Sequence, residues 1–155
     1  MGGRAVSSAS SHEHPPFGFS TRMRVDFADT DAGGIVYFGR YGRYLERAII
    51  EYRRAVGLPL LGDPAHLFVV RTMSVEYHAP LRFDDDVEVF VTCPRIGTTS
   101  HTMQARLERI DAGGALHVAD ARAVIVGVDS WDDGTPTPMP DSFRSAIEAF
   151  EARTH

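Results

Sequence analysis

Hydrophobic and polar positions first alternate in the segment from Phe19 to Phe27. Every second residue there is apolar or threonine, and the residues between them are mostly charged. A period of two is typical of a strand with one buried face, so we expect Phe27 to lie on the same buried side as Phe19. Small and acidic residues from Asp29 to Gly34 then interrupt the alternation and predict a loop.

A different period follows the loop and predicts a long helix from about Gly39 to Val56. Apolar residues recur there at steps of three and four, which gives the segment one apolar face. Gly57 stands where a C-terminal cap is expected, and Pro59 prevents the helix from continuing. The apolar positions are Tyr41, Leu45, Ala48, Ile49, Tyr52 and Val56.

The remainder of the chain is typical of antiparallel strands followed by a short helix. Asp111 to Gly114 is a hairpin turn signal, and Asp141 is placed to cap a final helix. One long helix with five strands in succession is an α+β arrangement in which the sheet wraps around the helix. Such a sheet leaves open edges, which favour a partner. The four later strands are expected at Leu67–Tyr77, Val87–Cys93, Ser100–Ile110 and Ala115–Val128.

The length and composition indicate one globular domain. The chain has 155 residues, 43% of them hydrophobic, and a formal charge of −5. We expect a single domain over residues 17–155, preceded by a disordered tail over residues 1–16 that is rich in Ser, Gly and His and lacks the apolar core of a secretory signal. The negative charge argues against general nucleic-acid binding, and no segment approaches the ~18 apolar residues of a membrane span. Cys93 has no second cysteine to pair with, which favours a cytoplasmic protein.

Several familiar kinds of site are missing from the sequence. It has no glycine-rich phosphate loop, no dinucleotide fingerprint and no serine nucleophile elbow, so no cofactor is expected. Cys93 falls inside a predicted strand, where a nucleophile is disfavoured. The histidines are scattered singly, without the spacing of zinc ligands, so we predict no metal site. Outside the predicted tail they include His66, His78, His101 and His117.

The most informative segment runs from Asp29 to Tyr41, where two carboxylates precede two glycines and a helix start. A calcium loop would need a glutamate at its twelfth position, which is Arg40 here, and a preceding helix, which is missing. The carboxylates could instead order the turn through side-chain hydrogen bonds to the backbone. A third interpretation is catalytic: a carboxylate beside the free N–H groups of a helix start can act as base or nucleophile while those groups bind an oxyanion.

The stretch from Val25 to Ala48 resembles the signature of the 4-hydroxybenzoyl-CoA thioesterase family. The similarity extends over about Phe19 to Val128, and it is strongest to the branch of short-chain and aryl acyl-CoA thioesterases that includes the Tol–Pal-associated enzymes. The resemblance implies the hotdog fold, a curled antiparallel sheet around one long helix. It also implies hydrolysis of an aryl or short-chain acyl-CoA by a homodimer or homotetramer with sites between subunits.

The resemblance also assigns the catalytic groups. Asp31 matches the catalytic carboxylate, as nucleophile or general base, and Asp29 matches a supporting acid. The backbone amide of Phe38 matches the group that polarises the thioester carbonyl. Some members carry histidine in place of Phe38 and tyrosine in place of Phe27, so Asp31 with backbone help is the economical mechanism.

The remaining assignments concern substrate binding and Glu46, a carboxylate on the predicted long helix. Tyr37, Tyr41 and Tyr44 could line an acyl or aryl pocket, or they could supply bulk to the core and the interface. Glu46 is expected to pair with Arg43 or with an arginine across an interface. A turn near the pantetheine and nucleotide is assigned to Arg95, Gly97, Thr98, Thr99 and Ser100. Two other functions on this fold stay open: a non-catalytic acyl-CoA binding protein, and a dehydratase, although the His/Asp motif of the latter is not found.

Overall fold

The computed structural model describes residues 17–60 and 67–153. The predicted tail over residues 1–16 lies outside these ranges. The elements are β1 (Phe19–Arg24), the 3₁₀ turns η1 (Phe27–Asp29) and η2 (Phe38–Arg40), α1 (Tyr41–Val56), β2 (Leu67–Tyr77), β3 (Asp86–Ile96), β4 (Ser100–Asp111), β5 (Gly114–Val128) and α2 (Asp141–Arg153). No helix within the described ranges has both the length and the apolar character needed to cross a membrane.

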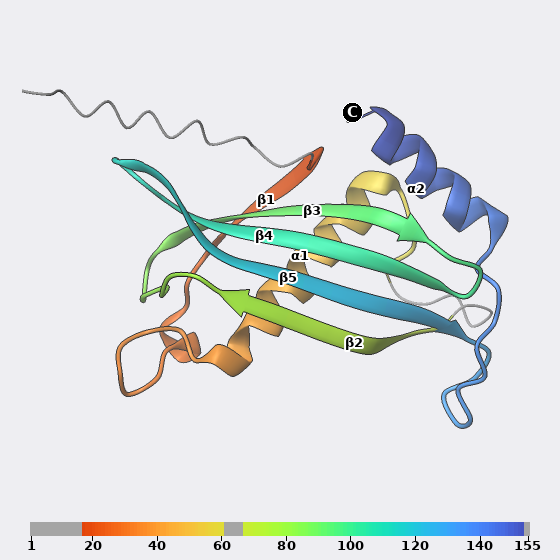
Figure 1. Cartoon of the computed structure of the whole chain (residues 1–155), viewed down its shortest axis with the longest axis horizontal. Coiled ribbons are helices and arrows are strands. Elements are labelled where there is room, and N and C mark those ends of the chain that lie inside the picture. The colour runs from red at the N-terminus through yellow and green to blue at the C-terminus, as the bar shows by residue number, and fades with distance from the viewer. Residues whose placement is uncertain (1–16, 61–66, 154–155) are drawn as a thin grey trace, which may run out of the picture.

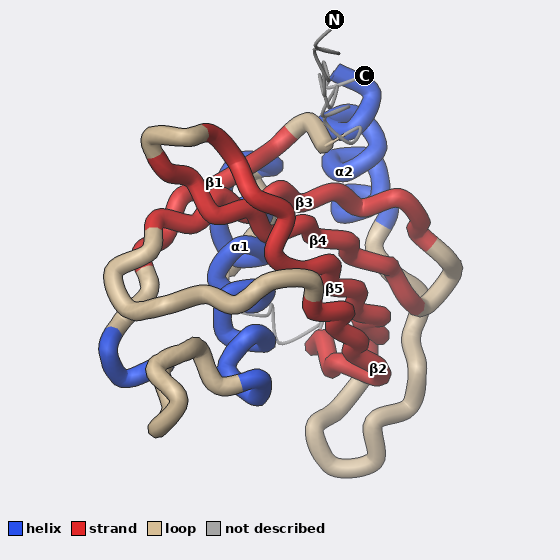
Figure 2. The backbone as a smooth tube through the Cα atoms, turned by 60° about the vertical axis from the view of Figure 1, so that its left-hand side comes forward, coloured by secondary structure: helices blue, strands red, loops and turns tan. Residues whose placement is uncertain are grey.

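The strands form one five-stranded antiparallel sheet in the order β1-β3-β4-β5-β2. Helix α1 runs along one face of this sheet, and α2 lies beside the end of the sheet where β3 meets β4 (Figure 1). The sheet is strongly twisted and curls over α1 (Figure 2). The predicted α+β architecture, with one long helix against five antiparallel strands, is confirmed.

The core lies between α1 and the sheet, as the two hydrophobic periods require. Every second residue of β3 points toward the helix, from Val87 to Cys93, and each is buried. Tyr52 and Leu45 of α1 are almost completely inaccessible to solvent. Full burial of an aliphatic side chain such as Leu45 contributes about 1.5–3 kcal/mol, so tertiary packing dominates the stability of α1.

Helix α1 ends as predicted and starts slightly later. Gly57 adopts a left-handed φ of 86°, and its N–H donates to the carbonyls of Arg53 and Arg54 at 3.0 and 3.1 Å. This positive φ is the conformation that glycine tolerates best. At the other end, a 3₁₀ turn from Phe38 to Arg40 precedes the first α-helical residue, Tyr41.

The prediction for the end of the first strand was wrong. β1 stops at Arg24, and Phe27 is 74% exposed rather than buried. Val25 exchanges its last backbone hydrogen bonds with the loop at Asp84 and Asp85, and the chain then turns into the 3₁₀ segment η1. The alternation in sequence therefore continues past the point where a neighbouring strand is available for pairing.

Candidate active site

The loop before α1 is a tight turn built around Asp31. Its Oδ1 accepts a hydrogen bond from the N–H of Gly33 at 2.8 Å, and its carbonyl accepts one from Gly34 at 3.0 Å. Gly34 has a φ of 76°, which a residue with a β-carbon adopts only with strain. Asp31 itself is exposed, and within the described residues its Oδ2 makes no hydrogen bond. One carboxylate oxygen thus holds the turn while the other is available for chemistry.

Asp29, two residues earlier, anchors this loop to α1. Its carboxylate is 2% exposed, accepts from Arg43 at 2.6 Å and from the hydroxyl of Tyr44 at 2.8 Å. The second nitrogen of Arg43 reaches Asp26 at 3.0 Å, and the hydrogen bond to Asp29 helps to raise the pKa of Arg43. Burial, followed by the hydrogen bond to Asp29, raises the pKa of Tyr44. The Asp29 carboxylate is therefore fully engaged in positioning, and Asp31 is the carboxylate left exposed.

Asp31, Phe38 and Tyr41 line one pocket of about 350 Å³ beside the start of α1. The opposite wall comes from the end of β2 and the segment after it, through Tyr77 and Pro80. The pocket is also lined by Ile35, Val36, His78 and Ala79. The structure therefore brings together the predicted carboxylate, the predicted amide and Tyr41, one of the three tyrosines considered for the pocket.

The peptide groups at Phe38 are oriented by a tyrosine from across the pocket. The hydroxyl of Tyr77 donates to the carbonyl of Phe38 at 2.9 Å. The N–H of Phe38 donates to no backbone carbonyl in the part of the chain that the structure describes. A free amide at the start of a helical segment carries partial positive charge and suits an oxyanion.

Aromatic rings make the wall of the pocket largely apolar. Tyr41 meets Tyr77 edge to face, with ring centroids 4.9 Å apart. Tyr41 is 4% exposed, and burial raises the pKa of its hydroxyl, so this group stays neutral in the pH range of the cell. Tyr37 lies outside this pocket in the single chain, where its ring packs on Phe38 at 4.5 Å.

The predicted binding turn lies at the other end of the sheet. Arg95 and Gly97–Ser100 join β3 to β4 next to α2, whereas the Asp31 loop lies beyond the end of β2 (Figure 1). Ser100 is paired with Val126 and Tyr77 with Ala119, so seven residues of β5 separate the two ends. At about 3.3 Å per residue this is a separation of about 20 Å within one chain.

Two further expectations concern reactive and charged side chains. Cys93 is buried, and burial raises the pKa of its thiol to about 12, which fits the prediction that it is no nucleophile. The expected pair between Glu46 and Arg43 does not form, because Arg43 is held by Asp29 and Asp26, and a pair between Glu46 and an interface arginine stays a prediction. The attraction of a buried carboxylate outweighs that of the exposed Glu46 one turn away on the helix.

Sequence reasoning did not assign roles to Tyr77 and His78, which line the pocket. The available signal was the position of the segment Tyr77-His-Ala-Pro80 directly after a strand at the edge of the sheet. Its contact with Phe38 joins positions 39 residues apart, which no local pattern reveals.

Comparison with known proteins settles the family. The model of the thioesterase-like superfamily matches residues 25–147, which include the Asp31 loop, α1 and the whole sheet after β1. The chain belongs to the thioesterase-like superfamily. The predictions of a thioesterase and of the hotdog fold are thereby confirmed.

Named relatives of this thioesterase-like chain carry the same activity in their names. It is 36% identical over 133 residues to the acyl-CoA thioesterase YbgC of Haemophilus influenzae, covering 84% of this chain and 94% of that protein. It is also 36% identical over 113 residues to the acyl-CoA thioester hydrolase YbgC of Escherichia coli O6:H1, covering 72% and 82%. A 4-hydroxybenzoyl-CoA thioesterase structure superposes with a TM-score of 0.76 at 18% identity, covering 83% and 97% of the two chains, and it supports the fold.

Proposed function

We propose that this chain hydrolyses the thioester of an aryl or short-chain acyl-CoA to the free acid and CoA, with Asp31 as the catalytic carboxylate. The observation that carries the proposal is the shared pocket: the exposed Asp31 and Phe38, the first residue of the 3₁₀ turn before α1, line the same apolar cavity. The names of the relatives supply the substrate class, acyl-CoA. A volume of about 350 Å³ is in the range of small-molecule sites and suits a compact acyl group packed against the wall that Tyr41 and Tyr77 form.

In the proposed reaction the thioester carbonyl oxygen accepts a hydrogen bond from the Phe38 N–H. Negative charge develops on this oxygen in the transition state, so the amide binds the transition state more strongly than the substrate. Asp31 acts in one of two ways. Its carboxylate attacks the carbonyl carbon and expels the CoA thiolate, leaving a mixed anhydride that water hydrolyses, or it removes a proton from the water that attacks.

Replacement of Asp31 by asparagine tests the proposal, because Asn keeps the shape of the side chain and removes its charge. We expect a loss of about two to four decades in kcat for acyl-CoA hydrolysis, measured by thiol release over a panel of aryl and aliphatic substrates. Asp111→Asn is a matched control, because Asp111 makes the same side-chain hydrogen bond to the N–H two residues later, at Gly113, at 2.8 Å. Full activity of Asp31→Asn would refute the assignment.

A single turnover in ¹⁸O-labelled water distinguishes the two chemical routes. Label found in the Asp31 side chain would establish nucleophilic attack, because the anhydride is then opened at the aspartyl carbon. Label confined to the product acid, with no acyl-enzyme trapped by rapid quenching, would establish the water route.

We further propose that the working site is completed by a second copy of the chain. Among the described residues no strand pairs with the far edge of β2, and Val70, Met73 and Tyr77 of this strand are 61%, 52% and 47% exposed. Within one chain about 20 Å separates the turn that carries Arg95 from the end of β2 beside the Asp31 loop, and a second subunit could place its own Arg95 closer to the substrate. Light scattering of Met73→Asp against the unsubstituted chain tests this: we expect dissociation together with loss of activity, and an active monomer would exclude it.

The same thiol-release assay separates the other two functions. A non-catalytic binding protein would bind acyl-CoA without releasing thiol, and a dehydratase would release water from a hydroxyacyl substrate and leave the thioester intact. The cytoplasmic location stays a prediction, to which the single buried Cys93 adds support.

A further inference from the structure

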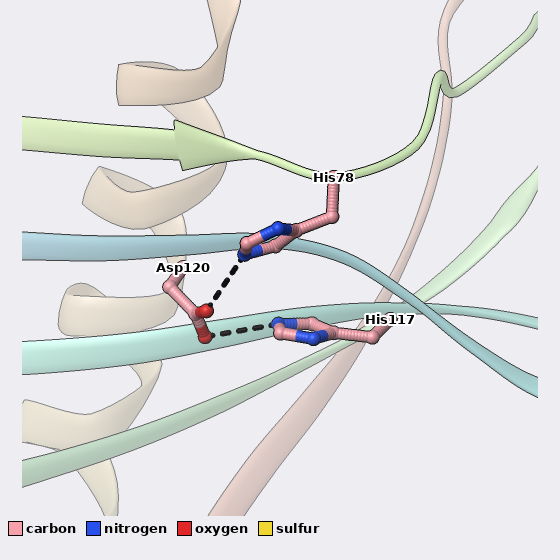
Figure 3. Close-up of side chains that lie close together, drawn as sticks. All are labelled: His78, His117 and Asp120. Carbon is pink, nitrogen blue, oxygen red and sulfur yellow. Dashed lines mark hydrogen bonds and ion pairs between the residues drawn. The ribbon is translucent and has the colours of Figure 1, made fainter.

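We propose that His78, His117 and Asp120 form a binding site for a divalent transition metal of the Zn²⁺ class. This proposal does not depend on the proposed function. Figure 3 shows both imidazole rings turned toward the carboxylate of Asp120. His78 Nε2 lies 3.0 Å from Asp120 Oδ2, and His117 Nε2 lies 3.0 Å from Asp120 Oδ1. All three residues offer ligand atoms within 4.8 Å of one another.

A β-bulge explains why two residues of β5 contribute to the same cluster. On a regular strand, His117 and Asp120 are three positions apart and point to opposite faces. In the structure Leu107 pairs with Ala119 and Glu108 pairs with His117, so Val118 is an extra residue in β5. The added residue turns the side chains of His117 and Asp120 to the same side of the strand. Bulges beside functional sites commonly re-orient a side chain in this way.

The same bulge also fixes the third residue. The carbonyl of Val118 accepts hydrogen bonds from the N–H of His78 at 2.8 Å and from the N–H of Ala79 at 3.1 Å. These bonds join the segment after β2 to β5 at the point where Asp120 projects. The backbone thus holds His78 against its two partners, although 39 residues separate it from His117 in the sequence.

Hydrogen bonding within the cluster leaves one of its nitrogens unsatisfied. Nε2 of His117 is shielded from solvent, yet its approach to Asp120 lacks hydrogen-bond geometry and no other partner is found in the described part of the chain. An imidazole nitrogen without a hydrogen bond is free to present its lone pair to a metal ion. The centroids of the two imidazole rings lie 4.4 Å apart, which is close enough for both rings to bind the same cation.

The chemistry and spacing of these groups suit Zn²⁺. Zn²⁺ binds histidine nitrogens and carboxylate oxygens, and a site with three protein ligands carries water in the fourth position. Ligands bonded at about 2.0–2.1 Å in a tetrahedron lie about 3.3 Å apart. The two separations of 3.0 Å involve different oxygens of Asp120, and ligand atoms of all three residues lie within 4.8 Å of one another, so side-chain rotations have to bring them to a common centre. The side chains are 31–46% exposed and have room to make them.

The charges around the cluster do not oppose a cation. Glu76 and Arg106 are the cross-strand neighbours of Asp120, and Glu108 is the neighbour of His117. The guanidinium of Arg106 is paired with Glu108, with Nε 2.8 Å from Oε1, so its charge is compensated. Glu76 adds a further negative charge.

Calorimetric titration of the metal-free full-length chain with Zn²⁺ at pH 7.5 tests the proposal. We expect one ion per chain, and His117→Gln and Asp120→Asn to weaken binding about 10-fold or more. The control is the double variant His12→Gln/His14→Gln, which removes the two histidines near the N-terminus that could bind zinc independently; it should keep the full affinity. Equal affinity in wild type and His117→Gln, or loss of binding only in the control, would overturn the proposal.

A measurement on the unsubstituted chain keeps the proposal testable if the variants fail to fold. In a ¹H–¹⁵N spectrum of the histidine side chains, Zn²⁺ should move the ring resonances of His78 and His117 and leave the buried His101 unchanged. Shifts confined to other histidines, or none at a several-fold excess of zinc, would show that the cluster binds no metal.

Discussion

Acidification should destabilise this protein through one buried histidine, His101 on β4. His101 is 2% exposed and packs edge-on against the stacked rings of Phe68 and Phe143, at centroid distances of 5.6 and 5.2 Å. Burial, and secondarily the positive charge of Arg53, lowers its pKa from the ordinary 6.5 to about 4. Its Nδ1 has no hydrogen-bond partner in the described residues, so no hydrogen bond at this nitrogen offsets the cost of charging the ring.

The size of the effect follows from the two pKa values. Below pH 6.5 the unfolded chain binds a proton on His101, whereas the folded chain does so only near pH 4. Stability therefore falls as the pH falls through this window, by about 1.36 kcal/mol per unit of pH difference. Over the whole window the loss is about 3 kcal/mol, a large share of the 5–15 kcal/mol typical of a domain, and it corresponds to a decrease of roughly 6–12 °C in Tm.

Chemical denaturation of wild type and His101→Leu at pH 7.5 and pH 4 isolates this contribution. Both proteins will lose stability in acid through other groups, but the wild type should lose about 3 kcal/mol more. Arg53→Met removes the positive charge near His101 and should partly reduce the additional loss of stability that His101 causes in acid. Equal acid losses in wild type and His101→Leu would refute the reasoning. Unfolding in acid would distort the measured pH dependence of hydrolysis. The dependence of the hydrolysis rate on pH is therefore best measured above pH 6.5, where His101 does not destabilise the fold.

Three further substitutions have outcomes that denaturation or activity measurements can check. Asp29→Asn removes the charge that holds Arg43 and Tyr44 and should lower the free energy of unfolding by about 1–3 kcal/mol and reduce activity, because the Asp31 loop loses its anchor. Gly34→Ala imposes a β-carbon on a residue with φ of 76° and should cost about 1–2 kcal/mol, whereas an unchanged Tm would show that the turn adapts. Glu151→Ala should destabilise the fold by about 1–3 kcal/mol and Glu151→Gln by less, because this carboxylate accepts from Tyr52, Thr92 and the N–H of Cys93.

Elements with a strong local signal were predictable from the sequence, and the error in this fold concerns the point at which one of them ends. The span of α1 and its cap at Gly57 follow from a repeat of three and four residues and from a single left-handed residue. The end of β1 was misplaced because alternation reports which side chains are apolar, not where a pairing strand ends. Phe27 belongs to the pattern in sequence but lies beyond the last bonds to β3.

In the candidate site, too, contacts between residues close in the sequence were predictable and contacts with a separate element were not. The Asp31 turn was readable because its hydrogen bonds join residues two to four positions apart. The role of Asp29 as the anchor of the loop depends on Arg43 and Tyr44 in the first turn of α1, and only the packing of the loop on the helix selects it over Glu46 as the partner of Arg43.

The sequence by itself determined the helix, the strands, the turn that carries Asp31 and the resemblance to a thioesterase family, because each is encoded by short-range periodicity or a contiguous motif. Only the tertiary structure decided that Tyr77 faces Phe38, that Arg95 lies at the opposite end of the sheet, and that His78 meets His117 and Asp120. Such contacts depend on strand register, which sums many weak cross-strand interactions, and a single extra residue at Val118 changes which face a side chain occupies.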